Sequence, residues 1–588
     1  MFKSILKYLT KKEWALIAVI GVFNIAQVWL NLRMPEYTGE ITLLVQTPGS
    51  SMDDIYSAGI GMLLCAVGSL IAVVVICFIA SRVAARLSQR MRSSMFERVD
   101  EFSLGDINKF SLASLITRST NDVTQVQFAV TMGLQLIMFA PMLAVWATIK
   151  IIHMNIEWTY ATGIAMACVV VLFAVVLIAV FPKFKKMQEL TDNVNRVARE
   201  NLTGLPVVRA YNAEEYQDRK FERANEDLTV TQLFTQRSFA VMLPMIMIIM
   251  NLLMLAVYWI GAILIDNVGP GADGVPIFAN MMVVMAYAMM TMMAIMLTLM
   301  IFVVLPRAQV AARRIYEVIE TEPSIKGGNV RESDSNTKGE VEFRNVSFKY
   351  PGAVDYVLKD VSFKAKQGET VAFIGSTGSG KTTLINLVPR FYDVTEGAVL
   401  VDGIDVREYE LSALYEKIGY IPQKSVLFTG TVTSNVAFGE KAGVKATEDD
   451  VRNAVRIAQG QDFVEEMPEQ YEGEIARGGT NLSGGQKQRL SIARAICKNP
   501  EIYIFDDSFS ALDYKTDRAL RTALKKETKG VTSMIVAQRI GTIMDADRII
   551  VLDKGEVVGV GTHRSLLKTC DVYREIAISQ LSEKELAI

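Results

Sequence analysis

Six long apolar runs in the first half of the chain limit its fold more than any other feature. They cover residues 14–32, 60–80, 128–152, 158–181, 239–265 and 277–305. A helix rises about 1.5 Å per residue, so each run is long enough to cross a hydrocarbon core of about 30 Å. Charged sequence continues several runs on one side only, as in 81–92 and 182–200. We therefore predict six membrane-spanning helices, several of which extend into water.

Basic residues are concentrated in the second and fourth connections between these runs. The other three connections are shorter, and only the first holds a basic residue, Arg33, beside Glu36, Glu40, Asp53 and Asp54. By the positive-inside rule, both termini and the two long connections face the cytoplasm, and the chain is a multi-pass protein of the cell inner or plasma membrane. Arg33 could meet an anionic solute, but a pair with Glu36, one helical turn away, is the favoured interpretation.

A polar segment, 321–339, divides the chain. It contains Pro323, Gly327 and Gly328, which is typical of a linker. We predict a transmembrane domain over 1–320 and a soluble domain over 340–588. The two long cytoplasmic connections are interrupted by glycine, proline and small polar residues, which indicates a short cross-helix at each tip.

A glycine-rich loop in the soluble domain matches the pattern G-x-x-x-x-G-K-[ST]. It follows the strand-like run 370–374 and opens the helical run 383–388, which is the context that the pattern requires. The N–H groups of such a loop converge on phosphate, while Lys381 can reach the β- and γ-phosphates and the Thr382 hydroxyl can bind Mg²⁺. The sequence therefore predicts a nucleoside triphosphate site formed by Gly375, Ser376, Thr377, Gly378, Ser379, Gly380, Lys381, Thr382 and Thr383.

Other residues of this domain fit the same chemistry. Tyr350 could stack on a purine, although a lone tyrosine is more often only packed. Gln423 could reach Mg²⁺ or the attacking water, and Asp506, at the end of the apolar strand 502–505, could hold the Mg²⁺ shell. A second anion site is indicated where a hydroxyl, glycine N–H groups and a helix N-terminus meet, at Ser483, Gly484, Gly485 and Gln486. Two phosphate sites in one chain imply that phosphates are held between two nucleotide domains.

Together these motifs resemble the ABC exporters, specifically a half-transporter with six spans followed by one nucleotide-binding domain. The resemblance covers nearly the whole chain. It implies an α-helical transmembrane domain followed by an α/β P-loop ATPase domain of the ABC type, with two ATP and Mg²⁺ held between the Walker A loop of one chain and the signature of the other. It assigns the A-loop, Q-loop, Walker B, signature and D-loop to Tyr350, Gln423, Asp506, 482–486 and 510–513, and the coupling helices to the tips near 109–115 and 209–214.

Two residues depart from the family pattern at the chemical step. The glutamate that polarises water is Asp507, and the switch histidine is Gln538. Aspartate is one methylene shorter, and a misplacement of about 1 Å can cost on the order of 100-fold in rate. Glutamine offers no titratable group, and neither His153 nor His563 lies where it could replace the histidine. We interpret Asp507, Gln538 and Gln423 as a degenerate catalytic set, completed by a different half-transporter whose own site needs this chain's signature. The alternative is a slow homodimer.

The sequence indicates the transported solute less clearly than it indicates the ATPase domain. Methionines at spacings of three and four share one face of the sixth span: Met281, Met285, Met289, Met292, Met296 and Met300. Flexible thioethers suit a surface that repacks around different apolar ligands, although plain helix packing is the alternative. We predict export of small amphipathic or hydrophobic, drug-like solutes, with a lipid or peptide exporter as the alternative.

Composition and domain organisation argue against several other classes of protein. Lys and Arg total 61 against 63 Asp and Glu, which gives no reason to expect a nucleic-acid partner. Five cysteines without paired spacing argue against a disulfide framework and a zinc site. The fused spans and motor argue against an importer, and the six spans exclude a soluble ATPase. A ligand-gated channel remains a different class, which single-channel recording would separate from a pump.

Overall fold

The computed structural model describes residues 8–47, 49–268, 274–332, 338–439, 444–527 and 530–581. The chain divides into two compact units. Unit 1 comprises Met1–Arg98 and Ala113–Thr321, and unit 2 comprises Val99–Leu112 and Glu322–Ile588. The segment Val99–Leu112, which the sequence assigns to the membrane domain, thus belongs to the unit that carries the nucleotide motifs. Residues 333–337 of the predicted linker lie outside the described residues.

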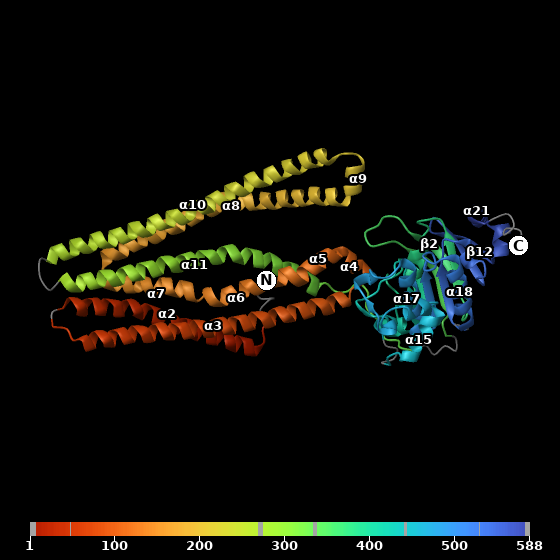
Figure 1. Cartoon of the computed structure of the whole chain (residues 1–588), viewed down its shortest axis with the longest axis horizontal. Helices are drawn as coiled ribbons and strands as arrows, with labels where there is room; N and C mark the ends of the chain where they lie inside the picture. The colour runs from red at the N-terminus through yellow and green to blue at the C-terminus, as the bar shows by residue number, and fades with distance from the viewer. Residues whose placement is uncertain are drawn as a thin grey trace. The chain divides into compact units, whose positions relative to one another are not determined.

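Unit 1 contains the six long apolar helical segments that the sequence predicts (Figure 1). Helices suit these runs because in lipid every backbone polar group must be satisfied within the segment. The third segment is interrupted by a π-helical turn, Arg118–Asp122, and by a break before Phe139. The helices that lie wholly or mostly in this unit are α2 (Lys11–Gln46), α3 (Met52–Asp100), α5 (Leu112–Thr117), α6 (Val123–Leu136), α7 (Phe139–Met154), α8 (Ile156–Thr203), α9 (Leu205–Ala210), α10 (Glu214–Val268) and α11 (Gly274–Glu320).

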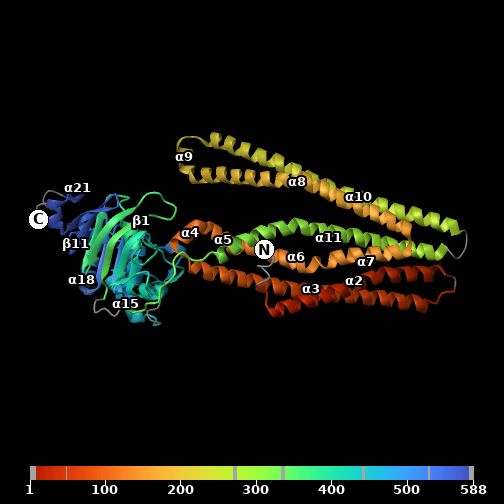
Figure 2. The ribbon, with the colours of Figure 1, turned by 180° about the vertical axis from the view of Figure 1, so that it is seen from behind.

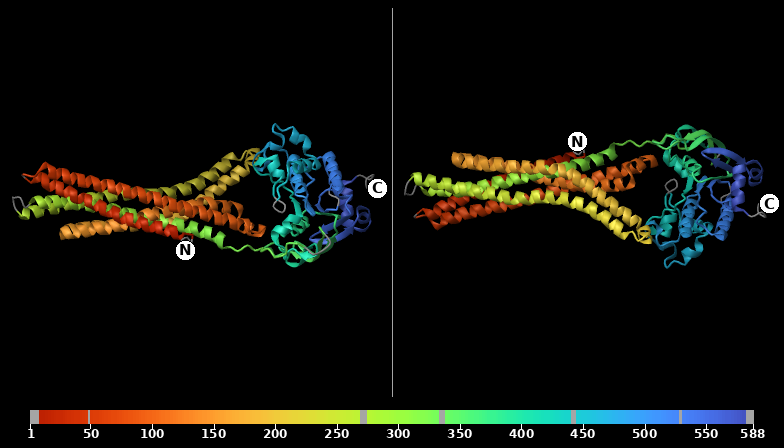
Figure 3. Two further views of the ribbon diagram at one scale, coloured as in Figure 1. Left: turned by 90° about the horizontal axis from the view of Figure 1, so that it is seen from below. Right: turned by 90° about the horizontal axis from the view of Figure 1, so that it is seen from above.

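Helices α8 and α10 form a hairpin that is closed by the short helix α9. The two helices pack along each other and leave the other helices of unit 1 toward α9 (Figures 1 and 3). Gly204 ends α8, and Pro206 lies in the first turn of α9, where its missing N–H has no helical partner to lose. The cross-helix predicted at 209–214 is therefore placed wrongly, because α9 ends at Ala210 and α10 begins at Glu214.

The other predicted cross-helix lies in unit 2 as α4 (Leu104–Phe110). Ser103 and Asp106 form a capping box at its start. Asp106 Oδ2 also accepts hydrogen bonds from the N–H and the hydroxyl of Ser324, at 3.0 and 2.9 Å. Burial acts to raise the pKa of Asp106, but the hydrogen bonds from Ser324 and Ser103 outweigh it and lower that pKa. Ser111, with φ of 60°, ends α4, so the predicted helix 109–115 is divided between two helices.

The nucleotide domain of unit 2 is built on two main sheets (Figure 2). The antiparallel sheet has the order β2-β1-β4-β5, and the six-stranded sheet has the order β12-β11-β3-β10-β9-β6. In the six-stranded sheet all pairings are parallel except that of β11 with β12. All five residues of β9 are buried, as expected of a strand covered on both faces.

The strands of unit 2 are β1 (Val341–Phe348), β2 (Leu358–Ala365), β3 (Thr370–Gly375), β4 (Glu396–Val401), β5 (Ile404–Asp405), β6 (Ile418–Ile421), β7 (Gly430–Thr431), β8 (Glu474–Ile475), β9 (Ile502–Asp506), β10 (Thr532–Val536), β11 (Arg548–Asp553) and β12 (Glu556–Gly561). Its helices beyond α4 are α12 (Lys381–Asn386), α13 (Leu411–Lys417), α14 (Val432–Val436), α15 (Glu448–Ile457), α16 (Gln461–Glu465), α17 (Gly484–Cys497), α18 (Tyr514–Glu527), α19 (Ile540–Ile543), α20 (His563–Thr569) and α21 (Asp571–Gln580).

Candidate nucleotide site

The predicted nucleotide residues converge at one edge of the six-stranded sheet. Strand β10 pairs in parallel with β3 and with β9, and β9 pairs in parallel with β6. Parallel strands end at the same edge, where α/β sheets bind their ligands. The glycine-rich loop follows β3, Asp507 follows β9, Gln538 follows β10 and Gln423 follows β6. Residues from four separate stretches of sequence therefore meet there.

The glycine-rich loop fits closely against its neighbours. A Cβ atom at Gly380, where φ is 95°, would lie 2.7 Å from a methyl group of Leu358. A Cβ at Gly375 would lie 2.0 Å from the carbonyl oxygen of Leu552. The N-cap of α12 is Gly380, which has no side chain to bond the first N–H groups of the helix. The backbone N–H groups of the loop are thus available to a phosphate, as in other glycine-rich loops that open a helix.

The Lys381 ammonium lies inside this loop. Its Nζ donates to the carbonyl oxygens of Gly375 and Ser376 at 2.9 and 2.8 Å. Burial lowers the pKa of Lys381, while the charges of Asp507 and Asp506 act to raise it. The ammonium is therefore held beside two carboxylates.

Thr382 and Asp506 supply oxygen atoms of the kind that Mg²⁺ prefers. The Thr382 hydroxyl donates to Asp506 Oδ1 at 2.9 Å. Burial raises the pKa of Asp506, and the hydrogen bond from Thr382 acts to lower it. Among the described residues no group of three His, Cys, Asp or Glu side chains is placed to hold a metal. This donor set fits an ion that, like Mg²⁺ in ATPases, is bound by few protein oxygens together with phosphates and water.

Asp507 lies in a strained position between two amide side chains. Its φ is 48°, and its N–H donates to the Val536 carbonyl oxygen at 2.9 Å. Asp507 Oδ2 accepts from Gln538 Nε2 at 2.9 Å, and Gln423 Nε2 lies 3.4 Å from the same oxygen. Burial raises the pKa of Asp507, although its hydrogen bonds act to lower it. The structure therefore brings the three predicted catalytic residues together.

The two histidines lie elsewhere. His563 begins α20, where it is buried with Nδ1 2.7 Å from the Tyr573 hydroxyl, and burial lowers its pKa. His153 lies in the last turn of α7, in unit 1. Within the described residues, neither histidine forms a hydrogen bond with Asp507 or the glycine-rich loop.

Tyr350 is packed by two other aromatic rings. Its hydroxyl lies 2.9 Å from Thr383 Oγ1, and the rings of Phe348 and Tyr392 meet it edge-on with centroids 5.0 and 5.2 Å away. Sequence reasoning missed Tyr392, because the only signal was an aromatic residue shortly after the glycine-rich loop. A Cβ at Gly105 of α4 would lie 3.8 Å from the Tyr392 ring. Tyr392 thus packs on Tyr350 and lies near the predicted coupling helix.

The signature segment opens α17. The Ser483 hydroxyl accepts a hydrogen bond from the Gln486 N–H at 3.3 Å, and the Gln486 side chain accepts one from the Ser483 N–H at 2.8 Å. This capping box fixes the start of the helix. Ser483 and Gly484 are exposed, and a Cβ at Gly484 would meet open space. The segment therefore presents a hydroxyl and a helix N-terminus at the surface of unit 2.

Unit 1 holds an apolar cavity of about 300 Å³ between α10 and α11. Met285 and Met289 of the predicted stripe line it, but Met281 and Met292 are buried in helix packing. The stripe is thus not one cavity surface, because α11 is covered by neighbouring helices on more than one side. The cavity is lined by Met247, Met250, Asn251, Leu253, Met254, Val257, Met285, Ala288 and Met289.

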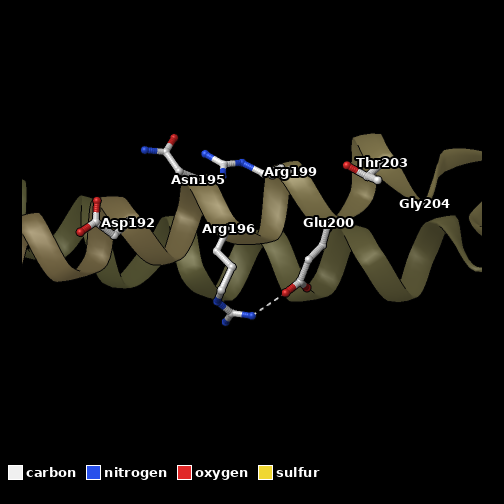
Figure 4. A pocket seen from close by; sticks show the side chains of 7 residues that line it. All are labelled: Asp192, Asn195, Arg196, Arg199, Glu200, Thr203 and Gly204. Carbon is white, nitrogen blue, oxygen red and sulfur yellow. Dashed lines mark hydrogen bonds and ion pairs between the residues drawn. The ribbon is translucent and has the colours of Figure 1, made fainter. Parts of the chain in front are cut away.

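A second hollow, near the tip of the α8–α10 hairpin, is open and polar (Figure 4). Arg196 donates to Glu200 across one helical turn at 2.7 Å, and Lys220 of α10 binds the other oxygen of Glu200 at 2.7 Å. Exposed ion pairs of this kind contribute little stability. The hollow is a solvated surface, in contrast to the apolar cavity.

Comparison with known families matches both halves of the chain. Residues 17–279 match the ABC transporter transmembrane region, and residues 358–510 match the ABC transporter family. The fold and the site define an ABC exporter half-transporter, a membrane protein that works as a dimer and whose nucleotide domain binds ATP, normally with Mg²⁺, and hydrolyses it. The chain belongs to the ABC transporter family.

Relatives cover nearly the full length. An uncharacterized ABC transporter ATP-binding protein of Mycobacterium tuberculosis is 37% identical over 99% of this chain and 98% of its own. An ATP-dependent lipid A-core flippase of Pseudomonas fluorescens is 33% identical over 85% of this chain and 81% of its own. The solved structure of a bacterial Atm1-family ABC exporter with ATP bound has the same fold, with a TM-score of 0.78 at 23% identity, and the match covers 97% of this chain and 99% of that one.

Proposed function

We propose that this chain is one half of a heterodimeric exporter that uses ATP to move amphipathic or hydrophobic, drug-like solutes out of the cell. In this proposal both termini and the nucleotide-binding domain are cytoplasmic. The basic second and fourth connections support that orientation. The membrane domain and motor are fused in one chain, as in the exporters that it matches.

The observation that carries the heterodimer is the environment of Asp507. Its Oδ2 accepts an amide hydrogen bond from Gln538, at positions where the family has glutamate and histidine. A shorter carboxylate that already accepts this bond is poorly placed to orient a water on the γ-phosphate. Gln538 can hydrogen-bond but cannot take up a proton. This site therefore binds ATP through Lys381 and Thr382 while hydrolysing it slowly.

The partner's site is served by this chain's signature. Ser483 is exposed at the start of α17, and Gly484 leaves open space above the helix N-terminus. A γ-phosphate on the partner's Walker A loop would meet these donors. Hydrolysis at that composite site resets the dimer, and ATP that stays at the Asp507 site keeps the two nucleotide domains in partial contact.

The solute cavity supports an apolar cargo. Methionine side chains from α10 and α11 line it, with Asn251 as one polar side chain. Flexible thioethers adapt to ligands of different shape. The alternative cargo is a lipid, which the names of the lipid A-core flippases, 30–33% identical to this chain, favour. A peptide exporter and a slow homodimer are the remaining alternatives.

The test is to isolate the tagged chain from its native membrane and identify co-purifying chains by mass spectrometry. We expect a second, different ABC half-transporter with a glutamate after its Walker B aspartate. Recovery of this chain alone, with ATPase activity typical of an exporter, would overturn the heterodimer. A matched comparison is this chain expressed alone with Asp507→Glu, which should gain little ATPase activity, because residues that act as a unit are restored only together.

A further inference from the structure

A charged cluster joins three helices of unit 1. Glu36 on α2 accepts hydrogen bonds from Arg33 Nη1 at 2.7 Å and from Lys150 Nζ, on α7, at 2.6 Å. The Tyr287 hydroxyl, on α11, lies 2.8 Å from the Leu32 carbonyl oxygen and 3.2 Å from Glu36 Oε1. Helices α2, α7 and α11 pack on one another (Figure 1). The pair of Arg33 with Glu36 that the sequence favours is thus present, but Lys150 shares the same carboxylate.

The cluster has a net positive charge. Arg33 and Lys150 contribute two positive charges, and Glu36 contributes one negative charge. Among the described residues no other carboxylate forms an ion pair with either cation. Lys150 lies inside the apolar run 128–152, and Arg33 follows directly on the run 14–32. Long basic side chains near the ends of spans extend toward the membrane interface.

Within this chain the two cations are more exposed than the carboxylate that they share. The side chains of Arg33 and Lys150 are 49% and 44% exposed, against 25% for Glu36. Arg33 also lies over the ring of Trp29, 5.4 Å from its centroid, and that tryptophan is half exposed. Arg33 and Lys150 each donate one hydrogen bond to Glu36, which leaves further N–H groups of both side chains for another acceptor. Aromatic and basic groups of this kind suit the boundary between headgroups and acyl chains.

We propose that Arg33 and Lys150 form a binding site for the anionic headgroup, phosphate or carboxylate, of an amphipathic molecule. Glu36 pairs with both cations and offsets one of their two charges, and the Tyr287 hydroxyl lies within hydrogen-bond distance of that carboxylate. The apolar chain of the ligand lies along the adjoining membrane surface, where Trp29 is exposed. As an assignment of cargo class, this rests on the proposed export function. The headgroup source is either a transported amphiphile or a resident membrane lipid.

The test compares radiolabelled dodecyl phosphate with dodecylphosphocholine, which has the same chain but no net charge, on the purified complex in maltoside detergent without ATP. The wild type should prefer dodecyl phosphate, and Arg33→Gln combined with Lys150→Gln should reduce that preference about ten-fold, since hydrogen bonds to charged groups are lost. Arg237→Gln, which removes an exposed cation of α10 outside the cluster, should change nothing. Glu36→Gln should raise the preference, because it removes the competing carboxylate.

An unchanged preference in the double variant, or a lower preference in Glu36→Gln, would overturn the site. A general folding defect would weaken the binding of both probes equally and leave the ratio of their affinities near the wild-type value. That result would also count against the proposed site. Transport of labelled dodecyl phosphate into proteoliposomes, with ATP, separates cargo from resident lipid. A complex that binds with this preference but does not transport the probe would assign the site to a resident lipid and leave the proposed export function unaffected.

Discussion

The two phosphate-facing regions of unit 2 differ in what their side chains are able to do. At the Asp507 site the groups that grip a nucleotide, Lys381 and Thr382, are in place, but the carboxylate that should act on water accepts a hydrogen bond from Gln538. At the signature, Ser483 forms a complete capping box and is exposed. In the proposed heterodimer, this chain completes the partner's site, while its own site binds ATP and hydrolyses it slowly.

In the proposed function, nucleotide binding and the hydrolysis step are separated within one domain. The groups that bind the nucleotide act through backbone geometry and charge, which tolerate a change at Asp507, the residue after β9. The hydrolysis step depends on sub-ångström placement of one carboxylate, so the loss of a single methylene group lowers its rate. Loss of the signature should therefore be far more damaging than loss of Asp507.

The largest effect should come from Ser483→Arg. The guanidinium would fill the space above the N-terminus of α17, and we expect ATPase activity of the complex to fall on the order of 100-fold, as when a transition-state donor is removed. Ser483→Thr keeps the capping hydroxyl and should retain most activity. Steady-state phosphate release measures both variants. Near wild-type turnover in Ser483→Arg would mean that this signature completes no active site.

An intermediate effect is expected where Asp106 of α4 is hydrogen-bonded to Ser324. Asp106→Ala removes the acceptor of two hydrogen bonds from Ser324, so solute transported per ATP should fall about ten-fold, with ATPase activity largely kept. Asp100→Ala, an exposed acid of the same segment, is the control. Parallel assays of transport and hydrolysis in proteoliposomes provide the ratio. Equal losses of both rates would show a structural defect instead of uncoupling.

Local motifs and long apolar helices could be predicted from the sequence, whereas contacts between distant residues could not. Lys381, Asp506 and Ser483 were predictable because a short stretch of backbone demands them at fixed spacing. The six helices were predictable from apolar length alone. The contacts of Asp106 with Ser324 and of Lys150 with Glu36 join residues 218 and 114 positions apart, and no local pattern announces such pairs.

The methionine stripe shows a different limit of prediction. Helical spacing places Met285 and Met292 on one face, but one lines the cavity and the other is buried in packing. Periodicity reports a face, and the neighbouring helices decide what that face contacts. The tips of the long connections were misplaced by a few residues for a related reason, because Gly204 and Ser111 set the helix ends.

A smaller effect is expected in the cavity. Met285→Leu with Met289→Leu should change transport rates of individual solutes about three-fold in either direction, since branched side chains adapt less readily than thioethers. Met292→Leu, in the packed core, should leave the ratio between solutes unchanged. Competition among several labelled solutes measures these ratios. Identical ratios in all variants would return the stripe to helix packing.

The smallest change is expected at the residue on which the central claim depends. Asp507→Ala in the complete complex should leave steady-state ATPase activity within about two-fold of wild type, because residues of an impaired unit add little. Removing the partner's glutamate should lower activity on the order of 100-fold. The measurement is phosphate release by both variants, with bound nucleotide counted after rapid gel filtration. The account predicts that ATP persists at the Asp507 site through many turnovers. An Asp507→Ala complex as inactive as the partner variant would contradict it.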